Sequence, residues 1–169
     1  MAITEYETKF KRQIKGVCTG WIKRMDLSNE DMAEEDVVAP VWLKKGTMHF
    51  FSDGRPLIMV GPGTGVAAFR SVIQERASKQ KLVLIFGCRS EADDYYYKDE
   101  WEKMQADSVD LNVICAFSRE TPDAGKVYVQ HKIRENGEDL ASLILDDNAA
   151  IYVSGRAKFM PQSVEKAFA

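Results

Sequence analysis

The sequence has few of the residues that build metal sites or disulfide frameworks. Its three cysteines, Cys18, Cys88 and Cys115, are odd in number and far apart. They form no CxxC pair, so neither a zinc site nor a disulfide framework is indicated. Disulfides persist in oxidising compartments, and their expected absence favours a reducing one. We therefore expect a cytoplasmic protein.

Long apolar runs and an excess of positive charge are also missing. No apolar stretch approaches the roughly 20 residues that span a bilayer, and residues 1–15 lack the apolar core of a secretory signal. The formal net charge of -3 argues against a nucleic-acid binder, whose affinity needs a basic surface. A hydrophobic share of 45% and a charged share of 29% are ordinary for a globular protein. The 169 residues suffice for one core, or for one domain and part of another.

The character of the chain changes near Pro56. Residues 26–36 are strongly acidic and are typical of a solvated loop. Residues 37–51 then hold strand-like fragments that do not make a self-sufficient domain. We therefore expect residues 1–54 to be part of something larger, and residues 55–169 to form a domain of their own.

After Pro56, apolar runs and helical patterns alternate. The apolar runs predict buried strands at 57–60, 82–86, 111–117 and 149–153. Helical spacing predicts helices at 66–79, around Trp101 and Met104, at 127–145 with a break at Gly137, and at 158–168. Strands that alternate with helices predict right-handed βαβ units. The expected fold is α/β, a parallel Rossmann-like sheet with helices on both faces.

Ligands of such sheets bind at the carboxyl ends of the strands, so the residues that follow each strand indicate the ligand. These residues are small, hydroxylic or basic after all four predicted strands: Gly61-Pro62-Gly63-Thr64-Gly65, Gly87-Cys88-Arg89, Ser118-Arg119-Glu120 and Ser154-Gly155-Arg156. Such residues suit phosphate groups. We therefore expect a phosphorylated ligand at this end of the sheet.

The loop after the first strand is rich in glycine. Gly61, Gly63 and Gly65 allow a tight turn between a strand and a helix. Without side chains in the way, a phosphate can approach the backbone amides and the positive end of the helix dipole. Thr64 adds a hydroxyl donor. The alternative is a tight turn without a ligand, because the loop lacks the usual GxGxxG fingerprint.

A second group of polar residues follows the third strand. Ser118 and Arg119 end this strand, and Lys126 and Tyr128 come shortly after it. A hydroxyl, a guanidinium, an ammonium and a phenol together suit a 2′-phosphate, and the phenol ring could stack on adenine. No clear acidic residue ends the second strand to hold a ribose 2′-hydroxyl. The cluster therefore predicts NADPH rather than NADH, the alternative being a solvated polar loop.

Four other features invite a functional interpretation, but a structural one competes with each. His131 is expected to be a helix cap or a surface residue. The run Tyr95-Tyr96-Tyr97 is expected to pack in the core or at its edge. Asp93-Asp94 is expected to form a solvated face. Cys88 is either a reactive thiol activated by Arg89 or a buried one.

Five strings of the sequence resemble the NADPH-binding domain of the diflavin reductases, members of the ferredoxin–NADP reductase superfamily. The strings are VGPGTGVAAFR (60–70), FGCR (86–89), AFSRE (116–120), KVYVQH (126–131) and IYVSGRAKFM (151–160). They occur in the family's order and spacing from Pro56 to the end. Ala157-Lys158 and Met160-Pro161 most resemble the branch that serves cytosolic iron–sulfur protein assembly.

The segment Gly16-Val17-Cys18-Thr19 resembles the family segment that contacts the FAD pyrophosphate near the end of the flavin domain. The resemblance therefore implies that residues 1–54 are the C-terminal remnant of a β-rich FAD-binding domain with a connecting segment. Most of the FAD pocket would lie outside this chain, as would the FMN domain.

The resemblance also implies roles for single residues. Thr64 would lie against the pyrophosphate and the nicotinamide side, and Arg89 would meet the phosphates. The 2′-phosphate site and its surrounding cofactor-binding segment would comprise Ser118, Arg119, Lys126, Val127, Tyr128, Val129 and Gln130. Hydride would pass from the nicotinamide to FAD, and single electrons would pass through FMN to an acceptor such as an iron–sulfur assembly factor.

The sequence departs from the family where hydride transfer is assisted. Many members have Cys-Gly-Asp after the last strand, and this chain has Ser154-Gly155-Arg156. Ser154 would still contact the nicotinamide region as the catalytic residue, but it lacks the sulfur. Ala68 replaces a common proline, and Ser163 replaces an aspartate. These departures keep open a noncatalytic NADP(H)-binding or docking module that retained the fold.

Relatives also continue beyond the last predicted helix to a further helix and strand, which end in an aromatic residue that shields the flavin. The sequence stops at Ala169. The expected domain is therefore truncated at its C-terminus.

Overall fold

The computed structural model of the chain describes residues 5–24, 40–120 and 125–169. It divides into two compact units, Met1–His49 and Phe50–Ala169. The acidic stretch at 26–36, expected to be a solvated loop, lies outside the described residues.

The first unit contains a short hairpin and one helix. Strands β1 (Glu5–Glu7) and β2 (Gln13–Lys15) pair antiparallel, and α1 (Val17–Arg24) follows. None of the residues of α1 is buried within this unit. The strand-like fragments expected in 37–51 are wrong for the described part, because residues 40–51 contain no strand. Apolar and β-branched residues favour an extended backbone there, but a strand also needs a neighbouring strand to pair with.

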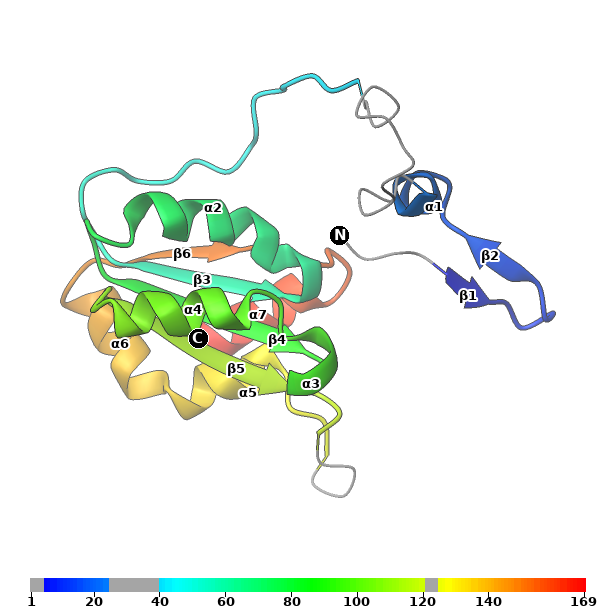
Figure 1. The fold of residues 1–169 in the computed structure, drawn as a ribbon. Coiled ribbons are helices and arrows are strands. Elements are labelled where there is room, and N and C mark those ends of the chain that lie inside the picture. Colours follow the sequence, from blue (N-terminus) through cyan, green and yellow to red (C-terminus); the bar gives the residue numbers. More distant parts are fainter. Residues whose placement is uncertain (1–4, 25–39, 121–124) are drawn as a thin grey trace. The chain divides into compact units, whose positions relative to one another are not determined.

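The second unit is built on a sheet of four parallel strands, which confirms the expected fold class. The strands are β3 (Leu57–Pro62), β4 (Leu82–Cys88), β5 (Leu111–Phe117) and β6 (Ala150–Val153), in the order β5-β4-β3-β6 (Figure 1). The strand β3 runs two residues further than predicted, because Gly61 and Pro62 still pair in register with Phe86 and Gly87. Pairing therefore extends into the glycine loop.

Helices cover both faces of this sheet (Figure 1). They are the 3-10 turn η2 (Gly63–Gly65), α2 (Val66–Arg76), α3 (Glu91–Asp94), α4 (Lys98–Ala106), α5 (Val129–Glu135), α6 (Gly137–Leu145) and α7 (Met160–Phe168). The break predicted at Gly137 is confirmed, since α5 ends at Glu135 and α6 begins at Gly137. The helix α2 ends three residues before the predicted Lys79.

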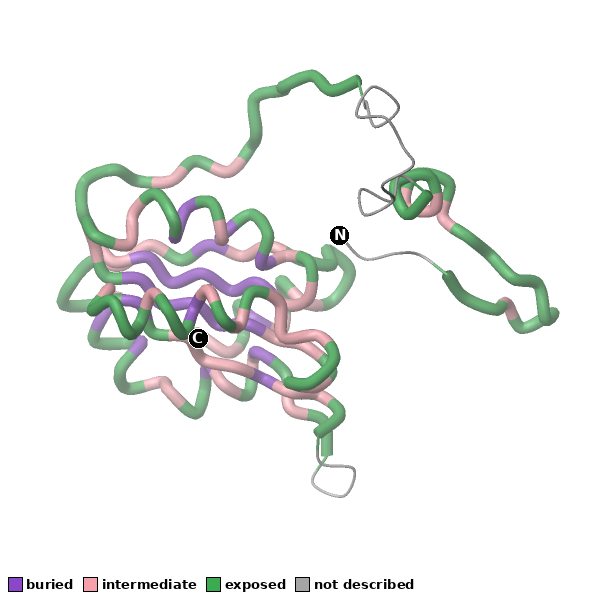
Figure 2. The backbone as a smooth tube through the Cα atoms, viewed as in Figure 1, coloured by how far each residue is buried: buried purple, intermediate pink, exposed green. Residues whose placement is uncertain are grey.

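The strands β3 and β4 are buried on both faces, as Figure 2 shows along their length. On one face, side chains of β3 and β4 pack against α5, α6 and α7 in a cluster that includes Ile58, Val60, Val83, Ile85, Ile133, Leu140 and Val164. On the other face, Phe69 of α2 lies against Gly61, and Tyr95 and Tyr96 lie against Phe86. Burying each large apolar side chain contributes roughly 1.5–3 kcal/mol, so these two central strands anchor the unit.

Trp101 of α4 gives the clearest test of this packing. Its side chain is fully buried, and its indole Nε1–H donates to the Tyr96 carbonyl at 3.0 Å. We expect Trp101→Ala to lower the free energy of unfolding by about 3–5 kcal/mol, measured by urea denaturation. Leu145→Ala is the control, because Leu145 is 81% exposed and its loss should change stability by less than about 0.5 kcal/mol. Equal effects of the two substitutions would contradict the assignment.

Candidate functional site

The strand order reverses at β3, and this places the loop after β3 beside the end of β6. The chain runs from β3 to β4 and β5 on one side, and β6 pairs with β3 on the other. The Ser154 N–H donates to the Val60 carbonyl at 3.0 Å, so the two strand ends are joined by backbone. Parallel sheets bind ligands at such a switch point, which makes this edge the candidate site.

Each of the three glycines in the loop is required for a different physical reason. A Cβ atom on Gly65 would lie 2.1 Å from the Ser154 carbonyl oxygen, and one on Gly61 would lie 2.8 Å from the Phe69 ring. Gly63 instead has a φ of 59°, which favours glycine. Packing therefore accounts for two glycines and backbone conformation for the third. Thr64 lies exposed in η2, directly before α2 begins at Val66.

Pro62 lies at the centre of this edge, a role that the sequence patterns did not predict. A Cβ atom on Gly87 would lie 3.3 Å from Pro62 and 2.8 Å from Val129, and one on Gly155 would lie 3.3 Å from Pro62 and 2.7 Å from Met160. The ends of β3, β4 and β6 thus close around one proline ring. The signal available in the sequence was a glycine near each of the other two strand ends, Gly87 within the last residues of β4 and Gly155 two residues after β6.

The loops after β4 and β5 run side by side beyond the sheet. The Ser118 N–H donates to the Cys88 carbonyl at 2.9 Å, and its hydroxyl donates to the same oxygen at 3.1 Å. The Arg119 N–H donates to the Arg89 carbonyl at 2.7 Å. The backbone of Arg119 is therefore fixed, while its side chain is exposed and makes no hydrogen bond or ion pair with another described residue.

The segment before α5 supplies the other predicted residues of this cluster. Lys126 is exposed, Tyr128 is 43% exposed and Gln130 is half-buried. The side chains of Val127 and Val129 pack instead in the core between the sheet and α5. Val129 is buried, so any ligand contact of this residue must come from its backbone, whereas Val127 is only partly buried.

His131 is confirmed as a helix cap. Its Nδ1 accepts the Tyr128 N–H at 3.2 Å, at the point where α5 begins. The two rings are 5.9 Å apart. His131 thereby fixes the backbone of Tyr128 and leaves the phenol ring partly open to solvent.

Arg89 is paired with Asp94, the last residue of α3. The guanidinium donates through Nε to one carboxylate oxygen and through an NH2 group to the other at 2.7 Å. These hydrogen bonds hold the pKa of Asp94 below its ordinary value, and the charge of Arg119 also contributes. The expected solvated face is wrong for Asp94, because its side chain is only 12% exposed. An ion-pair partner five residues upstream was not considered from the sequence.

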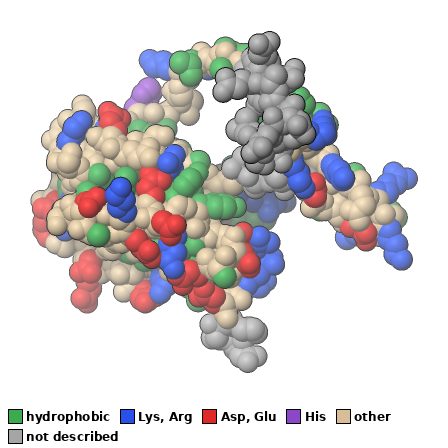
Figure 3. All heavy atoms as spheres, in the orientation of Figure 1, with side chains coloured by type: hydrophobic (Ala, Val, Ile, Leu, Met, Phe, Trp, Pro, Cys, Tyr) green, Lys and Arg blue, Asp and Glu red, His purple; other side chains and the backbone are tan. Residues whose placement is uncertain are grey.

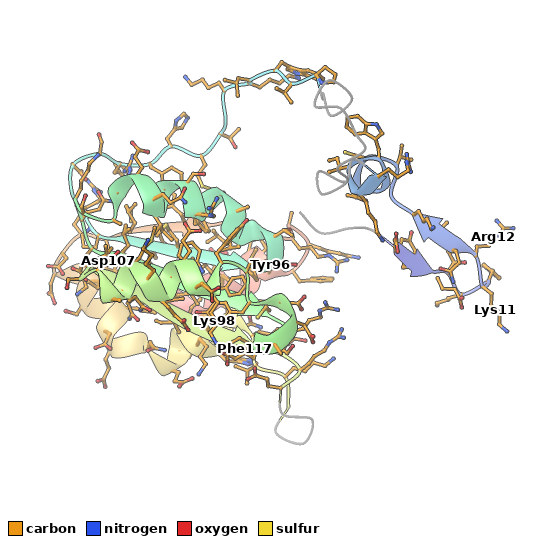
Figure 4. All side chains as sticks on the ribbon, viewed as in Figure 1. Lys11, Arg12, Tyr96, Lys98, Asp107 and Phe117 are labelled. Carbon is orange, nitrogen blue, oxygen red and sulfur yellow. The ribbon has the colours of Figure 1, made fainter. Side chains whose placement is uncertain are left out.

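The tyrosine run packs at the edge of the core, as expected. The Tyr95 ring stacks on Phe86 at 5.6 Å and meets the edge of Phe117 at 5.9 Å. Burial raises the pKa of Tyr95. Figure 4 shows the side chains of this region, with Tyr96 and Phe117 labelled.

Ser154 is half-buried at the end of β6. Its carbonyl lies against Gly65, and its hydroxyl makes no hydrogen bond with another described residue. Arg156 is exposed nearby in sequence. The Ser163 hydroxyl donates to the Phe159 carbonyl at 3.0 Å, which is a hydrogen bond to the backbone of its own helix four residues earlier.

The segment Gly16-Val17-Cys18-Thr19 forms the first turn of α1 in the other unit. The Gly20 N–H donates to the Gly16 carbonyl at 2.8 Å. Val17 and Cys18 are exposed within that unit. The backbone amides at the start of this helix are the groups that would face a phosphate.

Three broader findings bear on the site. Within the described ranges, no group of three His, Cys, Asp or Glu side chains could hold a metal ion. No described helix has both the length and the apolar character to cross a membrane. Acidic and basic side chains are interspersed on the face of the Phe50–Ala169 unit that Figure 3 shows.

Residues 59–166 match the family described as the oxidoreductase NAD-binding domain. The chain belongs to this family. It is 48% identical over 168 residues to the "NADPH-dependent diflavin oxidoreductase 1" of Danio rerio, which covers 97% of this chain and 27% of that protein. The corresponding Bos taurus protein is 40% identical and covers 97% of this chain and 27% of that protein. The "NADPH--cytochrome P450 reductase" of Cavia porcellus is 40% identical, with 98% and 25% covered.

These relatives are oxidoreductases, and the predicted membership of the diflavin reductase family, in its NADPH-binding domain, is confirmed. The chain spans about a quarter of the length of the curated relatives it matches, as the 27% and 25% coverages show. The activity of a whole diflavin reductase is therefore a matter for proposal.

The contact between Gly65 and Ser154 tests the geometry of the NAD-binding domain's switch point. We expect Gly65→Ala to lower the free energy of unfolding by about 1–3 kcal/mol or more, because the added methyl group would overlap a backbone carbonyl. Gly137→Ala is the matched control, since a Cβ atom there would meet nothing within 4 Å. Thermal unfolding followed by circular dichroism measures both. A Gly65→Ala protein as stable as the control would refute the contact.

Cys88 is expected to be an unreactive thiol, which favours the buried alternative. Burial and the nearby Cys115 raise the pKa of Cys88 to about 12, and its Sγ–H donates to the Ser90 carbonyl at 3.4 Å. At pH 8, four units lower, only about one thiol in ten thousand is ionised. Timed alkylation with iodoacetamide, followed by mass spectrometry, should modify exposed Cys18 long before Cys88. All three cysteines should react alike in urea, and equal native rates would contradict the assignment.

Proposed function

We propose that the Phe50–Ala169 unit binds NADPH across the carboxyl end of its sheet and delivers hydride to FAD within a longer diflavin reductase. The observation that carries this proposal is Arg119. Its backbone is fixed to the loop after β4, while its guanidinium is exposed and makes no hydrogen bond or ion pair with the rest of the described chain. A cation on a fixed backbone, with no hydrogen bond or ion pair to the described chain, is available to an external anion.

The chemistry around Arg119 favours a 2′-phosphate as that anion. Ser118 offers a hydroxyl beside it, and Lys126 adds a second exposed cation. Hydrogen bonds between charged donors and phosphate oxygens are about twice as strong as neutral ones. Tyr128, with its ring partly open to solvent, would stack on the adenine. NADH would leave these cations without a phosphate, so we infer a preference for NADPH.

The other end of the cofactor would follow the switch point. The glycine loop forms the turn η2 and leads directly into α2, an eleven-residue helix, and Thr64 is exposed in η2. The pyrophosphate would lie along this loop with Arg89 beside it. Gly65 contacts the Ser154 carbonyl, so Ser154 lies beside the glycine loop. We propose Ser154 as the residue beside the nicotinamide.

The flavins would be held mainly by parts of the full-length protein outside this chain. When bound, FAD supplies hydride acceptance, and FMN supplies single-electron transfer to an acceptor protein. Val17 and Cys18, at the start of α1, are exposed within their unit, and this supports an FAD pyrophosphate contact at the N-terminus of the helix. We further propose a cytoplasmic location and an acceptor of the iron–sulfur assembly class. The name of the Danio rerio relative supports the use of two flavins.

A noncatalytic NADP(H)-binding or docking module remains the second candidate. Ser154 and Arg156 favour it, because they provide neither the thiol nor the carboxylate that the resemblance leads one to expect for hydride transfer. Stopped-flow flavin reduction by NADPH in the full-length protein separates the two functions. Binding without any flavin reduction would favour the module.

The preference for a 2′-phosphate is measurable on this chain by isothermal titration calorimetry. We expect 2′,5′-ADP to bind much more tightly than 5′-AMP. Arg119→Ala should weaken NADPH binding by about 1.5–3 kcal/mol, the range for a hydrogen bond to a charged group, and should leave NADH little changed. Arg55→Ala is the control, because Arg55 precedes β3 at the opposite end of the sheet and is paired with Asp53. Equal weakening of both cofactors by Arg119→Ala would exclude a 2′-phosphate contact.

A further inference from the structure

Asp94 and Arg89 form an unequal pair. The Asp94 side chain is 12% exposed, whereas the Arg89 side chain is 58% exposed. The carboxylate binds the Nε and NH2 edge of the guanidinium. A guanidinium carries five N–H donors in a rigid fork, so the NH1 group and one hydrogen of NH2 stay available. The Asp94 carboxylate is thus the buried member of the pair, and the Arg89 guanidinium presents a second edge of N–H donors to solvent.

The short helix that carries Asp94 is itself tied to both neighbouring loops. The Ser90 hydroxyl accepts the Asp93 N–H at 3.3 Å and donates to the Asp93 carboxylate at 2.7 Å. The Glu91 N–H donates to the Glu120 carboxylate at 2.9 Å, which joins α3 to the loop after β5. Tyr95, the next residue after Asp94, stacks on Phe86 of β4. These contacts hold the Asp94 carboxylate in a fixed place relative to the ends of β4 and β5.

We infer that Asp94 is a positioning residue of the cofactor site, which holds Arg89 so that its free donor edge faces the pyrophosphate. This inference rests on the proposed function. Without Asp94, the long and exposed Arg89 side chain would have many rotamers to choose from, and ordering it would cost conformational entropy on binding. With Asp94, two parallel hydrogen bonds fix the plane of the guanidinium before the cofactor arrives.

The sign of one substitution separates positioning from simple electrostatics. Asp94 brings a negative charge close to a site that we propose for an anion. If only charge mattered, removing it would strengthen the binding of a phosphorylated cofactor. If Asp94 positions Arg89, removing the carboxylate weakens binding although the site becomes more positive. The two explanations therefore predict opposite changes.

The test compares NADP⁺ with adenosine 2′-monophosphate, which lacks the pyrophosphate, by calorimetry on this chain. Arg89→Ala should raise the Kd for NADP⁺ about tenfold or more, as expected for a lost hydrogen bond to a charged group. Asp94→Asn should raise it by a few-fold to about tenfold. In the Arg89→Ala background, Asp94→Asn should weaken binding no further. None of these changes should alter the Kd for adenosine 2′-monophosphate by more than about twofold.

Asp93→Asn is the matched control, because it removes the same charge from the same helix but touches Ser90 rather than Arg89. It should leave the Kd for NADP⁺ unchanged or slightly lower. Arg89→Lys adds a variant that keeps the positive charge without the fork, and it should weaken NADP⁺ nearly as much as Arg89→Ala. This variant tests the same geometry if Asp94→Asn does not fold.

The outcomes distinguish this inference from the proposed function. Failure of the unchanged chain to bind NADP⁺ or adenosine 2′-monophosphate would overturn both. Normal binding together with an unchanged or lowered Kd in Asp94→Asn would overturn the positioning role alone. So would equal weakening of both ligands by Asp94→Asn, which indicates general loss of structure, or wild-type affinity in Arg89→Lys.

Discussion

The close approach of three strand ends around Pro62 is the constraint on which the rest of the site depends. Gly65 has no room for a side chain because the Ser154 carbonyl lies where its Cβ atom would be. A Cβ atom on Gly87 or on Gly155 would lie too close to the Pro62 ring. Such backbone contacts are possible only with glycine. They bring the loop after β3 to the end of β6, and so they place η2 and the start of α2 at the edge of the sheet where a phosphate can approach.

Two arginine side chains at this edge differ in whether they are paired with a carboxylate. Arg119 has its backbone fixed and its side chain makes no hydrogen bond or ion pair with another described residue, whereas Arg89 is held by the enclosed carboxylate of Asp94. An unpaired cation on a fixed backbone can adapt to a phosphate that arrives from solvent, and a cation held by an ion pair can orient it. This division suits a ligand with phosphates at two places. It also explains how a chain with a net charge of -3 can have a local site for an anion.

The sequence predicted the sheet well because both central strands are buried on two faces. Continuous apolar runs such as Leu82 to Phe86 have no other stable environment, although the pairing of β3 and β4 continues past the glycine that follows each run. The segment 40–51 was predicted less well, because local propensity for an extended backbone does not reveal whether a partner strand is present. Among the predicted site residues, Thr64 and Arg119 are exposed and Val127 and Val129 pack against the core, and their ligand roles stay predictions.

By itself, the sequence determined the fold class, the family and the kinds of chemical group at the carboxyl ends of the strands. These properties depend on periodicity and on motifs, which are local along the chain. Only the tertiary structure decided which groups meet. It placed Pro62 at the centre of the site, paired Arg89 with Asp94 and closed Gly65 against Ser154. Contacts between distant residues depend on strand order and register, and the one-dimensional pattern does not specify them to within an ångström.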